Sequence, residues 1–214
     1  MRLLSLVLAV CAAGLLAGCG GSSRPASDPA PPAAPASRSA APDLVTQLRQ
    51  GGYVLYMRHA ATESAQDDPD LDLNDPGTQR NLSAEGRTQS REIGAAVRRL
   101  RIPIGTVLVS PYDRTRETAE IAFGPGRVRD TRDLISEAYP GVDDDQVAER
   151  LRRLLRQRPA DGTNTVLVSH GFNINRAAGL TIAEGDMVVF DPRAEKPLAP
   201  VTTISADDWR ALRG

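Results

Sequence analysis

Apolar residues in this chain fall into short β-branched runs, separated by segments in which apolar positions follow a helical period. Strands are predicted where the apolar runs are continuous, at 53–57, 106–109, 165–169, 187–190 and 201–204. Helices are predicted where apolar positions recur every three or four residues, at 43–50, 82–101, 111–123, 147–155 and 173–180. Strands that alternate with helices favour an α/β domain in three layers, with a mainly parallel central sheet covered by helices on both faces.

Polar residues and glycines predict where several of these elements begin and end. Asp43 is the expected N-cap of the first helix, and Gly51 and Gly52 are expected to end it. Ser110 is expected to cap the helix that starts at Pro111, with Asp113 as its reciprocal partner.

The N-terminal segment has the pattern of an export signal followed by a linker. Residues 3–17 form an apolar run of 15 residues, shorter than the roughly 20 that a membrane span needs. The run ends in Leu16-Ala17-Gly18-Cys19, which resembles the lipobox of bacterial lipoproteins. We therefore predict a signal peptide at 1–18, lipidation at Cys19, a Pro/Ala/Ser-rich tether at 19–42 and a catalytic domain at 43–214.

This interpretation predicts an exported protein, anchored through lipidated Cys19 to the bacterial cell envelope on its periplasmic or outer-surface side. An ordinary signal peptide, with Cys19 incidental, is the alternative. The other cysteine, Cys11, lies in the segment expected to be removed, so no disulfide, cysteine metal site or cysteine nucleophile is expected. A net charge of −1 gives no reason to expect nucleic acid as a partner.

Candidate chemistry is concentrated at the C-terminal ends of three predicted strands. The chain has only two histidines, and each follows a strand: His59 after 53–57 and His170 after 165–169. Arg58 immediately precedes His59, and Arg114 follows the strand at 106–109. Ligands bind at this edge of open α/β sheets. Guanidinium groups match phosphoryl oxygens bidentately, so the pattern predicts a phosphoryl site.

A histidine nitrogen is the natural nucleophile in a chain without a reactive cysteine. His59 fits this role because it adjoins Arg58, and His170 is placed to donate a hydrogen bond to a phosphoryl oxygen. Taken alone, either histidine is more simply explained as a core or turn residue, but two histidines at strand ends, with arginines beside two such ends, favour the catalytic role. A metal site on the two histidines is the other alternative, but it lacks any His-x-x-x-His spacing and needs a third ligand. We predict neither a metal nor a cofactor.

Four motifs in order resemble the histidine phosphatase superfamily, also called the phosphoglycerate mutase-like family. They are Arg58-His59-Ala60, the Leu-Ser-x-x-Gly-x-x-Gln pattern at 82–89, the Ser-x-x-x-Arg-x-x-x-Thr-Ala pattern at 110–119, and Ser169-His170-Gly171. The resemblance covers residues 53 to about 190. It implies the phosphoglycerate mutase-like fold, and it implies that His59 is transiently phosphorylated while Arg58, Arg114 and His170 complete the phosphate pocket.

The resemblance also implies an acid that protonates the leaving oxygen from a mid-chain loop. Glu137 is our candidate, and Asp143, Asp144 and Asp145 are the alternatives. A solvated loop carboxylate is the competing interpretation of Glu137.

Two features depart from the family pattern. Ala60 stands where glycine is usual, and we expect a small residue to be tolerated there. The long acidic loop at 62–80 either shapes the substrate entrance or only decorates the rim. Asn173 and Arg176 are possible rim residues, although a solvated helix face is the simpler interpretation.

These observations predict a phosphatase of the histidine acid type that hydrolyses phosphate monoesters of a small substrate through phosphohistidine on His59. A non-catalytic lipoprotein that binds a phosphorylated ligand is one alternative, but a binder needs no nucleophile beside its arginines. A phosphoglycerate mutase-type phosphotransferase is the other, and export argues against it. The pattern predicts neither the substrate nor the oligomeric state.

Overall fold

The computed structural model describes residues 41–136, 138–196 and 198–213. The predicted signal peptide, Cys19 and nearly all of the predicted tether lie outside these residues. The described helices are α1 (Ala41–Gln50), α2 (Ala84–Arg99), α3 (Asp113–Phe123), α4 (Asp144–Arg156), α5 (Gly171–Ala178) and α6 (Asp208–Ala211). No helix among the described residues has the length and apolarity needed to cross a bilayer.

The described strands form one sheet in the order β3-β2-β4-β1-β5-β6. Their bounds are β1 (Val54–Arg58), β2 (Ile104–Val109), β3 (Val128–Asp130), β4 (Asn164–Ser169), β5 (Met187–Phe190) and β6 (Pro200–Ile204). The pairs from β3 through β1 are parallel, whereas β5 runs antiparallel to both β1 and β6. The expected mainly parallel sheet is confirmed, and the predicted closing pair of strands is β5 and β6.

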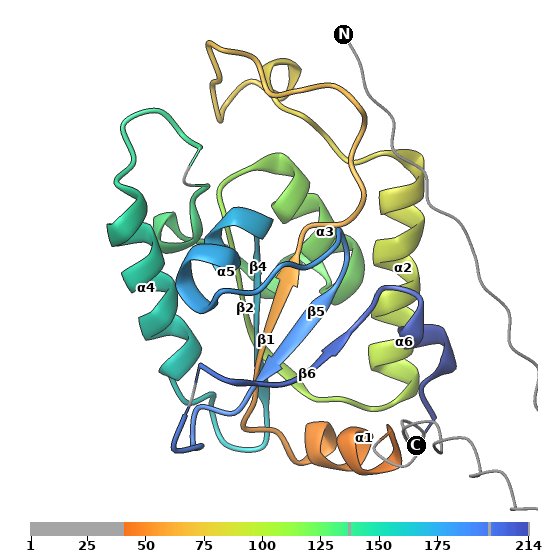
Figure 1. The fold of residues 1–214 in the computed structure, drawn as a ribbon. Coiled ribbons are helices and arrows are strands. Elements are labelled where there is room, and N and C mark those ends of the chain that lie inside the picture. Colours follow the sequence, from red (N-terminus) through yellow and green to blue (C-terminus); the bar gives the residue numbers. More distant parts are fainter. Residues whose placement is uncertain (1–40, 137, 197, 214) are drawn as a thin grey trace, which may run out of the picture. The chain divides into compact units, whose positions relative to one another are not determined.

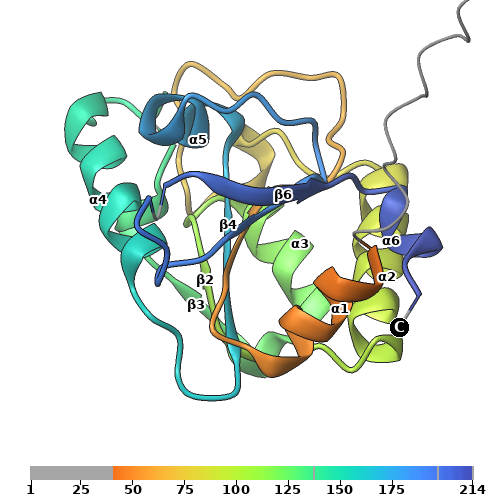
Figure 2. The ribbon, with the colours of Figure 1, turned by 60° about the horizontal axis from the view of Figure 1, so that its bottom comes forward.

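Helices cover both faces of the sheet, and each face has its own core (Figures 1 and 2). Along β1, Leu55 and Met57 pack with residues of α1, α2, α3 and α6. Val54 and Tyr56 point to the other face and pack with residues of α4 and α5. This alternation follows from the two-residue period of a strand and explains why the run at 53–57 is apolar at every position. The three-layer expectation is therefore confirmed.

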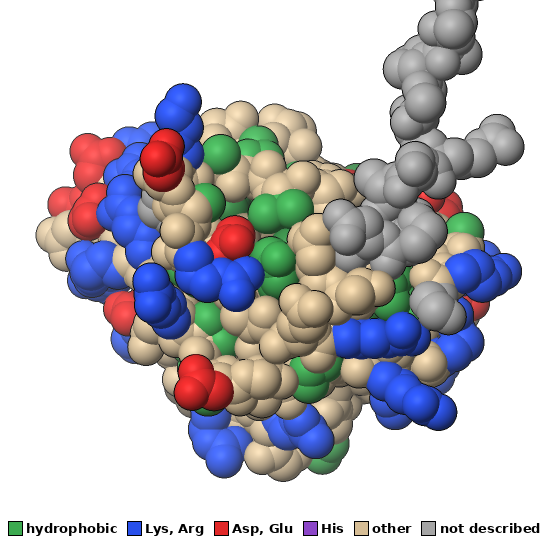
Figure 3. Space-filling view, turned by 90° about the horizontal axis from the view of Figure 1, so that it is seen from below, with side chains coloured by type: hydrophobic (Ala, Val, Ile, Leu, Met, Phe, Trp, Pro, Cys, Tyr) green, Lys and Arg blue, Asp and Glu red, His purple; other side chains and the backbone are tan. Residues whose placement is uncertain are grey.

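Parallel strands bring their C-terminal ends to a single edge of the sheet. Arg58 pairs in register with Ser169, and Val109 with Val168, so β1, β2 and β4 end side by side. In Figure 1 this edge lies at the top, beneath the loop at 62–80 and beside α5. Figure 3 shows the opposite end of the molecule, where acidic and basic side chains are interspersed with hydrophobic ones.

Both predicted N-caps are wrong. The first helix begins at Ala41, so Asp43 lies within α1. Helix α3 begins at Asp113 with Tyr112 as its N-cap, not at Pro111 after Ser110. The Ser110 hydroxyl is instead hydrogen-bonded to His170, 60 residues away. The Ser110 hydroxyl is thus used by a residue far away in sequence and not by the nearby helix. A local capping pattern does not predict such a long-range contact.

Candidate active site

The predicted strand ends meet at a cavity of about 430 Å³. Arg58 and His59 reach it from the end of β1, Arg114 from the first turn of α3, and His170 from the end of β4. All four residues line the cavity, and the ring centroids of the two histidines are 5.7 Å apart. The structure thus brings together the four residues that the sequence predicted for the phosphate pocket.

His59 is held as a neutral imidazole with one free nitrogen. Its Nδ1 lies 2.9 Å from the carbonyl oxygen of Ala60. A carbonyl can only accept, so Nδ1 carries the proton and Nε2 keeps its lone pair. Burial, with smaller contributions from the nearby charges of Arg114 and Arg58, lowers the pKa of His59 to about 3. The imidazole is therefore uncharged at neutral pH and keeps the Nε2 lone pair that a nucleophile requires.

Residues of two of the family motifs hold the turn that follows His59. The backbone N–H of Ala60 donates to Thr118 Oγ1 at 3.1 Å, and that of Ala61 donates to Gln89 Oε1 at 3.0 Å. Gly86 packs closely against the same turn, because a Cβ at its position would lie 1.9 Å from the carbonyl oxygen of Ala61. Gly86 is required for this close backbone approach.

Arg58 is held by groups that follow α5 in the chain. Its Nη1 donates to the carbonyl oxygen of Ile182 at 3.0 Å, and its Nη2 lies 3.4 Å from Glu184 Oε1. Glu184 also accepts from both the backbone N–H and the hydroxyl of Thr62. The Glu184 carboxylate thus holds both the Arg58 guanidinium and the backbone at Thr62, three residues after His59.

Arg114 is almost fully buried and is paired with Asp67 from the acidic loop. Its Nη1 and Nη2 donate to the two carboxylate oxygens of Asp67, at 2.8 and 3.2 Å. This is the bidentate geometry with which guanidinium binds a phosphoryl group. Tyr112 packs against the pair, with the Arg114 Cζ 4.3 Å from its ring centroid. Asp67 also lines the cavity, so the acidic loop shapes the entrance.

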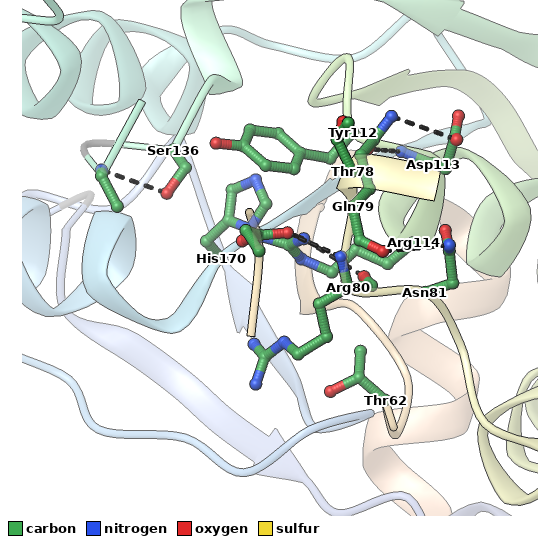
Figure 4. Close-up of polar contacts among 12 residues, drawn as sticks. Thr62, Thr78, Gln79, Arg80, Asn81, Tyr112, Asp113, Arg114, Ser136 and His170 are labelled. Carbon is green, nitrogen blue, oxygen red and sulfur yellow. Dashed lines mark hydrogen bonds and ion pairs between the residues drawn. The ribbon is translucent and has the colours of Figure 1, made fainter. Parts of the chain in front are cut away.

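Arg80 is a third arginine that lines the cavity (Figure 4). Its backbone N–H donates to Asp67 Oδ1 at 2.7 Å, and its carbonyl accepts from Arg114 Nη1. In Arg58, Arg80 and Arg114 alike, Nε is buried and has no hydrogen-bond partner among the described residues. Buried donors of this kind are normally satisfied, so three in one cavity indicate a site that is completed by an anion.

His170 is buried between Ser110 and Tyr112. Its Nε2 lies 2.8 Å from Ser110 Oγ, and its ring meets that of Tyr112 edge to face at a centroid distance of 4.8 Å. Burial is the main cause that lowers the pKa of His170 well below its usual value. Figure 4 shows His170, Tyr112, Arg114 and Arg80 gathered from three separate segments.

The candidate acids differ in their positions. Glu137 lies outside the described residues, but its neighbours Ser136 and Ala138 both line the cavity. Asp143 is the exposed N-cap of α4, and its bond to the Gln146 N–H lowers its pKa. Asp144 and Asp145 lie near Arg176, and none of these three aspartates lines the cavity.

The two possible rim residues on α5 do not line the cavity. Asn173 is fully buried, and its Nδ2 donates to the carbonyl oxygens of Leu134 and Ile135. It therefore anchors the segment that leads into Ser136. Arg176 pairs with aspartates on α4, in agreement with a solvated helix face.

Ala60 is fully buried, and Arg101 is the one described non-glycine residue with a positive φ. The backbone at Ala60 does not need glycine.

The sequence did not single out Asp67, Arg80, Tyr112 or Glu184 as site residues. Asp67 and Arg80 lie in a loop without periodicity, and the partner Arg114 is 47 residues beyond Asp67. Arg80 comes two residues before the Leu82-Ser83 motif, which is the one signal that a search around the motifs could have used.

Solved structures with the same fold share little sequence with this chain. One is a mutant phosphoserine phosphatase from Entamoeba histolytica in complex with phosphoserine. It is 14% identical to this chain with a TM-score of 0.53, and the match covers 72% of this chain and 97% of that one. Its complex with 3-phosphoglyceric acid gives 14% identity, a TM-score of 0.51 and coverages of 71% and 95%. The protein histidine phosphatase SixA, complexed with tungstate, gives 19%, 0.49, 73% and 98%.

No curated protein matches the chain in sequence. Residues 54–141 match the sequence model of the histidine phosphatase superfamily, branch 1. The matched range contains Arg58, His59 and Arg114, whereas His170 follows it and joins them in the fold. The ordered motifs, the fold and this match over residues 54–141 all support the histidine phosphatase superfamily for this chain.

Proposed function

We propose that this chain hydrolyses phosphate monoesters through a phosphohistidine intermediate on His59. The observation that carries the proposal is the state of His59, which is neutral and buried, with the Nε2 lone pair free. The three cavity arginines supply the positive charge that a transferring phosphoryl group needs. The proposed substrate is a small phosphorylated molecule.

The reaction has two steps. His59 Nε2 attacks phosphorus in line, and the bond from phosphorus to the leaving oxygen breaks as the nitrogen–phosphorus bond forms. The leaving oxygen takes a proton from an acid, for which Glu137 remains our candidate. Water then attacks phosphorus and gives a proton to the carboxylate that served as the acid. The nitrogen–phosphorus bond breaks, and inorganic phosphate leaves while His59 regains its lone pair.

His170 has a defined protonation state in this scheme. A neutral imidazole carries one proton, and donation to a phosphoryl oxygen requires that proton on Nδ1. Nε2 then accepts from the Ser110 hydroxyl, which lies 2.8 Å away. The Ser110 hydroxyl can donate to Nε2 and is therefore compatible with this tautomer of His170, whereas the Ala60 carbonyl, which can only accept, sets the tautomer of His59.

Hydrolysis of p-nitrophenyl phosphate by the full-length chain in detergent tests the proposal. His59→Ala should reduce kcat by at least about 10³-fold, because no other described group in the cavity replaces the nucleophile. His170→Asn, the control for a change at the other histidine, should retain measurable turnover. Activity that survives His59→Ala excludes the nucleophile, and tight phosphate binding without turnover in the wild type supports the non-catalytic alternative.

We also propose that the protein is exported and anchored to the bacterial cell envelope through lipidated Cys19. The lipobox resemblance at 16–19 supports this. Cells that express the full chain should incorporate labelled fatty acid into the wild type but not into Cys19→Ser. Label retained by Cys19→Ser would contradict the proposed anchor.

A further inference from the structure

Among the described residues, the cavity has a charged interior and an uncharged mouth. The most deeply buried residues that line it are His59, Arg114, Ser136 and His170. The exposed residues that line it are all uncharged: Gln66, Ala138, Phe172, Asn175 and Thr181. The charged residues in the lining are the three arginines and Asp67, which is bound to Arg114. A group that extends outward beyond the three arginines therefore meets only uncharged side chains among the exposed, described lining residues.

Phe172 is the largest apolar side chain at this mouth. It lies in the first turn of α5, two residues after His170, and 67% of its surface is exposed. Val201, at 46%, is the other large hydrophobic residue that the described part of the chain exposes. Single exposed apolar residues are ordinary on protein surfaces. Phe172 differs because it lines the cavity beside His170.

The size of the cavity points to a substrate with more than a phosphoryl group. Its volume of about 430 Å³ falls within the range of sites that bury whole small molecules. Ile182 extends the apolar wall from the inside, because its side chain is buried in the lining while its carbonyl holds Arg58. Ile182, beside the guanidinium, and Phe172, at the mouth, thus both contribute apolar surface to the lining.

We propose that Phe172 determines specificity by packing against the leaving group, and that the substrates are phosphate monoesters whose alcohol or phenol part is uncharged and presents a flat or apolar face. This inference rests on the proposed phosphatase function. Aromatic side chains bind flat and apolar groups through their ring faces. A second phosphate or a carboxylate on the leaving group would find no cationic partner at the described mouth.

Kinetics with two substrates test the inference. We would measure kcat/KM of the full chain and of Phe172→Ala on 2-naphthyl phosphate and on ethyl phosphate. Each variant is compared with the wild type on the same substrate, so the intrinsic reactivity of the leaving group cancels. Phe172→Ala should lose about tenfold on 2-naphthyl phosphate and stay within about twofold on ethyl phosphate.

Three controls separate packing from damage to the phosphoryl site. Phe172→Trp should keep activity on 2-naphthyl phosphate, because it retains an aromatic face. Val201→Ala removes the other exposed apolar side chain and should change neither substrate. Inhibition by inorganic phosphate should be unchanged in Phe172→Ala. An equal loss on both substrates, or none on 2-naphthyl phosphate, overturns the inference.

A binding measurement separates this inference from the proposed function. If the wild type turns over neither substrate, the phosphatase proposal fails, but calorimetry with 2-naphthyl phosphate and inorganic phosphate still tests Phe172. The inference predicts that the wild type binds 2-naphthyl phosphate about tenfold more tightly than inorganic phosphate, and that Phe172→Ala removes this advantage. Equal affinities in the wild type contradict it.

Discussion

Asp67→Asn tests whether the carboxylate of the acidic loop competes with a phosphoryl group for Arg114. In the structure, both Nη atoms of Arg114 donate to Asp67, while Nε has no partner among the described residues. A phosphoryl group must therefore share Arg114 with Asp67 or displace it. The substitution removes one negative charge and keeps the shape of the side chain. We expect phosphate to bind more tightly to Asp67→Asn than to the wild type.

The magnitude follows from two opposing electrostatic changes. Two anions on one guanidinium lie roughly 6 Å apart, and at an effective dielectric constant of about 20 they repel by about 3 kcal/mol per charge pair. The Asp67 side chain is 28% exposed, so solvent screening reduces this to about 1.5 kcal/mol, or roughly tenfold in affinity. Without phosphate, Asp67→Asn leaves the buried Arg114 charge unpaired, which costs about 2 kcal/mol of folding stability.

Thermal unfolding with and without inorganic phosphate measures both changes. Asp67→Asn should unfold about 5 °C below the wild type in phosphate-free buffer. Saturating phosphate should raise its Tm by more than it raises that of the wild type, because tighter binding stabilises the folded state further. Asp70→Asn is the matched control, since it removes an exposed charge from the same loop, and neither Tm nor phosphate affinity should change with it.

Weaker phosphate binding by Asp67→Asn would refute this reasoning. It would mean that Asp67 holds Arg114 in the orientation that phosphate needs, so that the carboxylate assists binding and does not compete with it. A phosphate-induced rise in Tm equal to that of the wild type would likewise show that the two anions do not share the guanidinium.

Three further perturbations follow from the site. Because burial lowers the pKa of His59 to about 3, neither its ring ¹⁵N nor its ring ¹H resonances should titrate between pH 5 and 8, and Nδ1 should carry the proton; a midpoint near 6.5 would contradict this. Between pH 3 and 6.5 the native state therefore binds fewer protons at His59 than the unfolded chain does. The contribution of His59 to stability is complete above pH 6.5 and is lost as pH falls toward 3. Acid unfolding of the wild type and of His59→Asn measures this loss. Gly86→Ala forces a Cβ onto the Ala61 carbonyl and should cost about 2–3 kcal/mol in denaturant unfolding and reduce kcat; an unchanged midpoint would show that the approach is not tight. Glu137→Gln should reduce turnover of alkyl phosphates more than that of p-nitrophenyl phosphate, since only poor leaving groups need the proton; equal losses would point to another acid.

The layer architecture was predictable because it depends on patterns that are local in sequence. The apolar runs at 53–57 and 165–169 are strands buried on both faces, and β-branched residues without alternation are typical of such strands. The ends of helices were less predictable. At Ser110, the hydroxyl is bound to His170 and not to the nearby helix start, so a tertiary contact overrides a local preference.

The site was predictable only where it follows strands. His59 and His170 were found because the ends of parallel strands share an edge, and Arg114 because it opens the helix after β2. Asp67 and Arg80 reach the same cavity from a loop that crosses the edge from outside. Their placement depends on contacts such as Leu71 and Leu73 with the cluster around Tyr112, which no periodicity along the chain records.

Trapping the phosphoenzyme would show directly whether His59 carries the phosphoryl group. Wild-type protein would be mixed with ³²P-labelled substrate and quenched within milliseconds, and the labelled peptide would be identified by mass spectrometry at alkaline pH, where phosphohistidine survives. We predict one labelled phosphoryl group on His59. The label should be absent from His59→Asn and present on His59 in His170→Asn. Turnover without any phosphohistidine, or with the label on His170, would contradict it.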